Sequence, residues 1–122
     1  MIEFVVPGRP VPAVRMTQRS KWVDPQAQRY LEYKEFAGWI AKQAVKQKPI
    51  NGQVAAKFRF YLKPKGRNPD LSNLIKAIED ALNKIVWKDD VQVRHIDASM
   101  IISKDEPERA EVMVREAEKE AS

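Results

Sequence analysis

Three acidic side chains and one lysine are the residues of this sequence whose types and spacing could do chemistry together. They are Asp70, Lys76 and the adjacent pair Asp89 and Asp90. Magnesium needs only one or two protein carboxylates, because water and phosphate oxygens complete its octahedron. A lysine near such an ion can offset the charge that develops on a phosphate during cleavage. The set therefore suggests a metal-dependent nuclease.

Each acid also has an ordinary structural role. Asp70 opens an expected helix, where an Asp usually serves as the N-cap. Asn68-Pro69 offers an alternative cap, with Pro69 as the first helical residue, and this would free the Asp70 carboxylate. Asp89 and Asp90 follow that helix at a turn, where Asp is common. Adjacent carboxylates repel each other unless a cation lies between them. If the next strand lies beside the helix start, one of the pair can join Asp70 at an ion.

Lys76 lies about 9 Å along the helix axis from Asp70. Helical side chains lean toward the N-terminus, so its ammonium group could approach the Asp70 carboxylate. Taken alone, Lys76 would be an ordinary solvated lysine. Asp80 is about 15 Å along the helix from Asp70, so these two acids cannot bind one ion and Asp80 is left out of the site.

Other reactive residue types are scarce. His95 is the only histidine and there is no cysteine, so we expect a structural rather than a catalytic role for His95. The tryptophans are expected in the core or at an interface, with base stacking as the alternative for the first of them; they are Trp22, Trp39 and Trp87.

The net charge of +5 is unevenly distributed. Residues 4–23 hold four basic residues and no acid, and a second basic group leads directly to Asp70. Positive patches concentrate phosphate backbones, although a solvated surface is the alternative explanation. The candidate DNA-binding residues are Arg15, Arg19, Lys21, Lys65 and Arg67.

Length and composition favour a single domain spanning residues 1–122, because 43% hydrophobic and 32% charged residues are typical of a globular protein. No apolar run approaches the roughly 20 residues that cross a bilayer, and the N-terminus lacks a signal-peptide pattern. Without cysteine there is no disulfide framework. We therefore expect a cytoplasmic protein that does not bind membranes.

Hydrophobic periodicity predicts an α+β fold, a mixed sheet with two main helices in the order β-α-β-α-β-β. Asp24-Pro25 should begin the first helix, which should end near Gln47. The other expected elements are a strand over residues 2–6, a basic loop at about 9–23, a strand over 54–62, a helix over 71–85, a strand over 91–102, a strand near 110–114 and an acidic, frayed tail at about 116–122. The apolar positions of the third strand change phase near His95, as a bulge would require.

Residues 68–93, NPDLSNLIKAIEDALNKIVWKDDVQV, resemble the RusA family of crossover junction endodeoxyribonucleases, which resolve Holliday junctions. An acid that opens a helix, Asn and Lys further along it, an Asp-Ala-Leu run and a Trp-x-Asp-Asp turn follow the family's order. The opening strand, the Pro/Arg-rich segment VPGRPVPAVRMT and the total length agree as well.

The resemblance implies a Mg²⁺-dependent homodimer, with Mn²⁺ as an alternative ion, that makes two symmetric nicks in branched DNA during recombination and repair. It implies that Asp70 and Asp90 are metal-binding catalytic acids and that Lys76 is the catalytic lysine. Asp89, the neighbour of Asp90, is a further candidate metal ligand. A bacterial or phage-derived (prophage) source fits the family.

One position departs from the family pattern, which has a second Asp two residues after the first. This chain has Ser72 there, and a hydroxyl is a weaker, uncharged ligand. The alternatives to an active nuclease are therefore a protein of the same fold that binds junctions with little or no cleavage, and a small interaction protein whose acids only cap and solvate.

Overall fold

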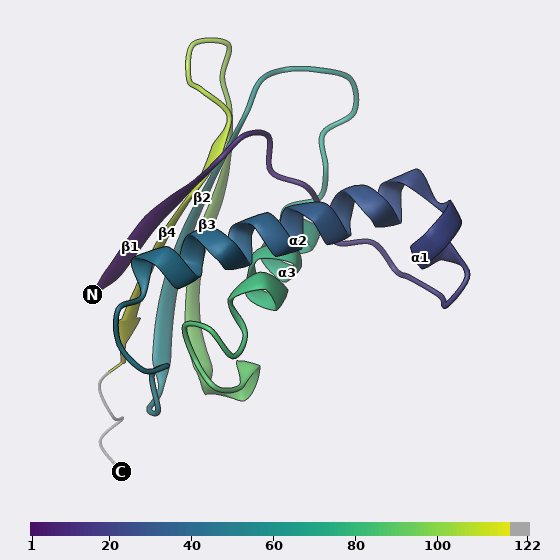
Figure 1. The fold of residues 1–122 in the computed structure, drawn as a ribbon. Helices are drawn as coiled ribbons and strands as arrows, with labels where there is room; N and C mark the ends of the chain where they lie inside the picture. Colours follow the sequence, from purple (N-terminus) through teal and green to yellow (C-terminus); the bar gives the residue numbers. More distant parts are fainter. Residues whose placement is uncertain (118–122) are drawn as a thin grey trace.

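The computed structural model describes residues 1–117, apart from the side chains of Ser20 and Lys21. Four strands and two long helices form a mixed α+β fold, as predicted (Figure 1). The elements are β1 (Ile2–Pro7), α1 (Ser20–Val23), α2 (Pro25–Ala44), β2 (Val54–Leu62), α3 (Leu71–Leu82), the 3-10 turn η1 (Asp90–Gln92), β3 (Val93–Ile102) and β4 (Arg109–Glu116). Glu116, expected in the tail, ends β4 instead, and tail residues 118–122 lie outside the described part.

The start of α2 is the one that Asp24-Pro25 predicts. The Asp24 carboxylate accepts a hydrogen bond from the Gln26 amide at 2.9 Å, and Pro25 is the first helical residue. The helix ends at Ala44 rather than near Gln47. The short helix α1 lies inside the segment predicted as a loop. None of the described helices is long and apolar enough to span a membrane.

The sheet has the order β1-β4-β2-β3, and β1 and β3 are its two edges. The pair β2–β3 is parallel, whereas β1–β4 and β2–β4 are antiparallel. The register of β2–β3 shifts between Val54 and Ala55, which pair with Val93 and His95. Arg94 is therefore the extra residue, which confirms the irregularity predicted near His95.

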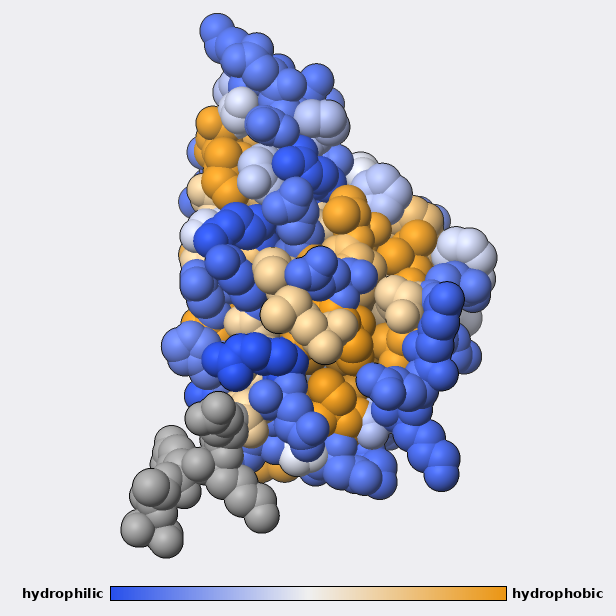
Figure 2. Space-filling view, turned by 90° about the vertical axis from the view of Figure 1, so that its left-hand side faces the viewer, coloured by the Kyte–Doolittle hydropathy of each residue, from blue (hydrophilic) through white to orange (hydrophobic). Residues whose placement is uncertain are grey.

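The core lies between one face of the sheet and the two long helices. Inward-facing residues of β2 and β4, such as Phe58, Phe60 and Val112, are almost completely buried, as are Leu74 and Ile78 of α3. The opposite face of the sheet carries no helix (Figure 1). Figure 2, which views the molecule from the left-hand side of Figure 1, shows apolar side chains in the middle of the visible surface with hydrophilic ones around them.

The three tryptophans fall into two classes. Trp87 is fully buried, which confirms its expected core position. Trp22 and Trp39 are 75% and 58% exposed, so neither lies in the core, and an interface position stays a prediction for both. Trp22 is exposed because its short helix α1 belongs to the basic segment before α2. Trp39 is exposed because it lies on the side of α2 opposite the buried residues of that helix.

Replacing Phe58 by Ala should destabilise the protein strongly. The ring is completely buried between the central strands and the helices, so its loss leaves a cavity that costs roughly 3–5 kcal/mol. Chemical denaturation measures the change. Trp22→Ala is the control, and it should stay within about 0.5 kcal/mol of the wild type because Trp22 is exposed. Equal midpoints for Phe58→Ala and the wild type would contradict this description of the core.

Candidate active site

Asp70 lies at the N-cap of α3 with an extended backbone, and its side chain makes no capping hydrogen bond. Its backbone carbonyl instead accepts hydrogen bonds from the amides of Asn73 and Leu74, at 3.1 and 3.2 Å. Asp70 is exposed and lies at the positive, N-terminal end of the helix dipole. The Asp70 carboxylate is free of a capping bond, as predicted. The predicted cause is wrong, however, because α3 begins at Leu71 and Pro69 is not the first residue of the helix.

The basic segment before α1 is fastened to the first half of α3. The Ala13 amide donates a hydrogen bond of 2.9 Å to the Asn73 carbonyl. Ala13 also packs against Tyr30 and Ala77 in a small apolar cluster. Four candidate DNA-binding residues are exposed, namely Arg15, Arg19, Lys65 and Arg67. The side chain of the fifth, Lys21, lies outside the described part of the structure.

Lys76 and Ser72 are both exposed residues of α3. Lys76 forms no ion pair with the residues that the structure describes. It is therefore available to a phosphate, as the predicted role requires.

Asp89 and Asp90 are held in different ways. Asp89 caps η1: its carboxylate accepts from the Val91 amide at 3.2 Å, and Gln92 Oε1 accepts from the Asp89 amide at 2.8 Å. Asp90 accepts a hydrogen bond of 2.8 Å from the indole N–H of the buried Trp87 through Oδ1. That bond fixes one oxygen of Asp90.

The fold separates Asp70 from this pair. The Gln92 side chain donates hydrogen bonds to the carbonyls of Ile50 and Gly52, at 2.7 and 2.9 Å, which fixes η1 beside the start of β2. Asp70 instead follows the end of β2, after the loop of residues 63–69. The intervening α3 has 12 residues and is therefore about 18 Å long.

Within one chain, Asp70 and the pair Asp89 and Asp90 therefore flank opposite ends of α3. Asp90 lies near Glu79, whose Cα is about 13 Å along the helix axis from that of Asp70. Two oxygens bound to one Mg²⁺ ion are at most about 4 Å apart. Within residues 1–117, no three carboxylates or histidines converge where a metal could bind. The strand after α3 begins beside the end of that helix and not beside its start.

The far end of α3 holds an acidic cluster that the sequence did not reveal. Burial raises the pKa of Glu79, and the negative charges of Asp90 and then Asp80 raise it further. Asp80 accepts a hydrogen bond of 2.6 Å from the Tyr30 hydroxyl. Burial and then this bond hold the pKa of Tyr30 well above its usual range. Asp90 comes close to Glu79 because η1 lies beside the end of α3. The local sequence pattern does not predict this proximity.

The arrangement is that of an α+β domain built on a parallel βαβ unit, with acids at both ends of the crossover helix and a lysine along it. Residues 7–115 match the family described as "Endodeoxyribonuclease RusA". The chain therefore belongs to the RusA endodeoxyribonuclease family, as its resemblance indicated, and family membership implies nuclease activity. It is also 30% identical over 135 aligned positions to "Uncharacterized protein YqaN" of Bacillus subtilis (strain 168), covering 93% of this chain and 91% of that relative.

Glu79→Gln should stabilise the protein at neutral pH. Because the folded-state pKa of Glu79 is raised above 4.5, ionising this residue costs stability, and the wild type loses stability as the pH rises through the raised pKa. The variant should melt a few degrees higher at pH 7 and at the same temperature near pH 4, where Glu79 is protonated in both states. Thermal melts at both pH values measure this, with exposed Glu32→Gln as the control. An equal rise at both pH values would contradict the argument.

Proposed function

We propose that this protein is a divalent-metal-dependent endonuclease that resolves Holliday junctions by paired symmetric nicks, as a homodimer, in DNA recombination and repair. Family membership supports endonuclease activity on DNA. The observation that carries the proposal is the free, exposed Asp70 carboxylate at the start of α3, with exposed Lys76 further along the same helix. Basic side chains of two segments near this helix offer contacts to the DNA backbone.

The proposed site is composite, because the two ends of α3 are too far apart to serve one ion. A two-fold axis across the middle of α3 would exchange the ends of this helix between two protomers. Asp70 of one protomer would then face Asp90 of the partner subunit. Each dimer would hold two such sites, and two sites related by symmetry are what paired nicks require.

The surface between the two ends of α3 favours such contact. β3 is an edge strand, so one row of its backbone groups has no partner strand within the sheet. Ile96 and Ile102 of β3 are 36% and 38% exposed, and Val91 of η1 is 70% exposed. Leu71 and Ile75 of α3 are only partly buried. Burying these apolar side chains against a second copy would favour the dimer.

The residues have separate roles in the proposed reaction. Asp70 and Asp90 would hold the ion, with Asp89 beside them; Mg²⁺ fits carboxylate ligands, and Mn²⁺ is the alternative. A bound divalent ion supplies water activation and charge neutralisation at the cleaved phosphate. Lys76 would stabilise the negative charge on that phosphate. The hydrogen bond from Trp87 would hold Asp90 in position and leave its second carboxylate oxygen for the ion.

Mixing two inactive variants tests the composite site. Asp70→Asn and Asp90→Asn should each abolish the nicking of a labelled four-way junction in Mg²⁺. A heterodimer of the two variants, co-expressed with different tags and purified through both, should regain one intact site and nick one strand. If each site lay within one chain, the heterodimer would have no intact site and no activity. Asp105→Asn, in the exposed turn before β4, is the matched control and should nick like the wild type.

Ser72 favours a second candidate function, a junction-binding protein with weak or absent cleavage. Ser72 is exposed in the first turn of α3, where the family pattern has an Asp. If the missing carboxylate disables the site, Ser72→Asp should produce nicking that the wild type lacks, while junction binding stays salt-sensitive in both. Nicking assays and binding titrations at two salt concentrations measure this. A wild type that already nicks as fast as Ser72→Asp would exclude this function.

A further inference from the structure

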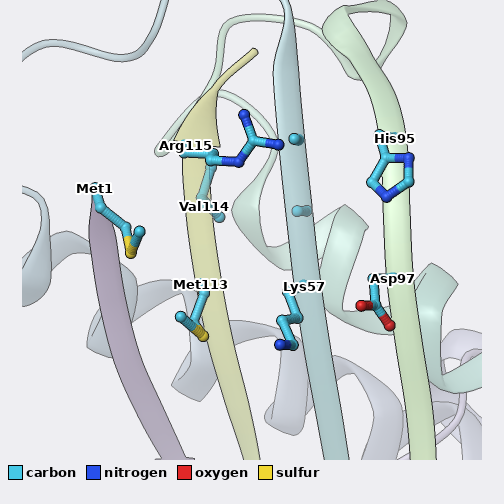
Figure 3. A pocket seen from close by; sticks show the side chains of 9 residues that line it. Met1, Lys57, His95, Asp97, Met113, Val114 and Arg115 are labelled. Atoms are coloured by element: carbon cyan, nitrogen blue, oxygen red, sulfur yellow. The ribbon is translucent and has the colours of Figure 1, made fainter.

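A hollow of about 160 Å³ lies on the outer face of the sheet, opposite the helices (Figure 3). A single buried water needs only about 10–15 Å³ of such space, so a tetrahedral oxyanion has ample room. The residues around it come from the three strands β2, β3 and β4 and from the N-terminal Met1, and include Ala55, Lys57, His95, Asp97, Met113 and Arg115.

The floor of the hollow is a small residue between longer ones. Ala55 of β2 pairs with Arg115 of β4 on one side and with His95 of β3 on the other. It is only 5% exposed although no helix covers this face, because its neighbours surround it. Figure 3 shows the Arg115 side chain reaching from β4 toward β2, with Lys57 and His95 on the same face.

Lys57 and Arg115 line the hollow, and within the described part of the chain they lack the acidic partners that Arg59 and Arg109 have on the same face. Arg109 is bonded to Glu106 and Glu111, at 3.1 and 3.0 Å, and Arg59 lies 3.9 Å from Asp97. Lys57 and Arg115 make no ion pair or hydrogen bond with the side chains that the structure describes.

The electrostatics of the hollow therefore favour an anion. Among the residues that the structure describes, Asp97 is the one carboxylate that lines the hollow, and Arg59, which lies outside the hollow, offsets that charge. Two cations on neighbouring strands repel each other unless an anion lies between them. His95 adds an N–H donor even when its imidazole is neutral.

We propose that this hollow binds one phosphate group of a nucleic acid, through the Arg115 guanidinium, the Lys57 ammonium and the His95 imidazole. The group would be either a backbone phosphodiester or a terminal phosphate monoester, since both present the same oxygens. The inference goes beyond the proposed nuclease function, because the hollow lies on the face opposite α3 and uses none of the candidate catalytic residues.

His95 provides the test, because it is the only histidine and its imidazole protons form a unique NMR signal. Inorganic phosphate, added at constant pH and ionic strength without divalent metal, should shift this signal saturably, whereas chloride should not. Arg115→Gln should weaken the apparent affinity about tenfold, through loss of a charge-assisted contact. Ala55→Leu, which fills the floor without changing charge, should do the same. Lys42→Gln, on the exposed side of α2, is the matched charge control and should bind like the wild type.

Two short DNA strands, identical except for a 5′-phosphate, identify the source of the phosphate group. Equal saturable shifts with both strands indicate a backbone phosphodiester, and a shift only with the phosphorylated strand indicates a terminal monoester. The proposal is overturned if neither strand moves the His95 signal, or if Arg115→Gln and Ala55→Leu both bind like the wild type. Since no metal is present, the outcome is independent of whether the protein nicks junctions.

Discussion

The parallel pairing of β2 with β3 is the constraint on which the arrangement of the candidate site depends. Two parallel neighbours cannot be joined by a tight turn, so the chain must return along the sheet before the second strand begins. Helix α3 is that return. Its first residue therefore follows the end of one strand, and its last residue precedes the start of the next. Any residues that flank α3 on both sides are separated by the length of the helix.

Packing and hydrogen bonds within the chain hold both ends of α3 in place. At the start, the Ala13–Asn73 backbone bond and the apolar cluster around Tyr30 fasten the basic segment to the helix. At the end, Gln92 ties η1 to the chain before β2, and Trp87 fills the core while it holds Asp90. The placement of the acids at opposite ends of α3 is thus a property of the packed fold.

Local patterns predicted the elements of this fold well, because their signals are local. The alternation of residues 54–62 predicted β2, and Asp24-Pro25 predicted the start of α2. The phase change near His95 reflected a real register shift. The exposed Asp70 carboxylate was also predictable, whereas its distance from Asp90 was not, since sequence alone did not decide whether β3 begins beside the start or the end of α3. The acidic cluster of Glu79 and Asp90 was missed for the same reason.

In the proposed dimer, this separation would couple cleavage to assembly. A lone protomer offers one free carboxylate at one end of α3 and, at the other, a pair whose oxygens already accept bonds from Trp87 and Val91. In the composite site, carboxylates from both ends would hold the divalent ion together with the phosphate. Pairing two protomers would complete both sites at once, since the same axis relates them. Such a dimer would cut both strands only when it is assembled, and that would protect a junction from being left with a single nick by a stray monomer.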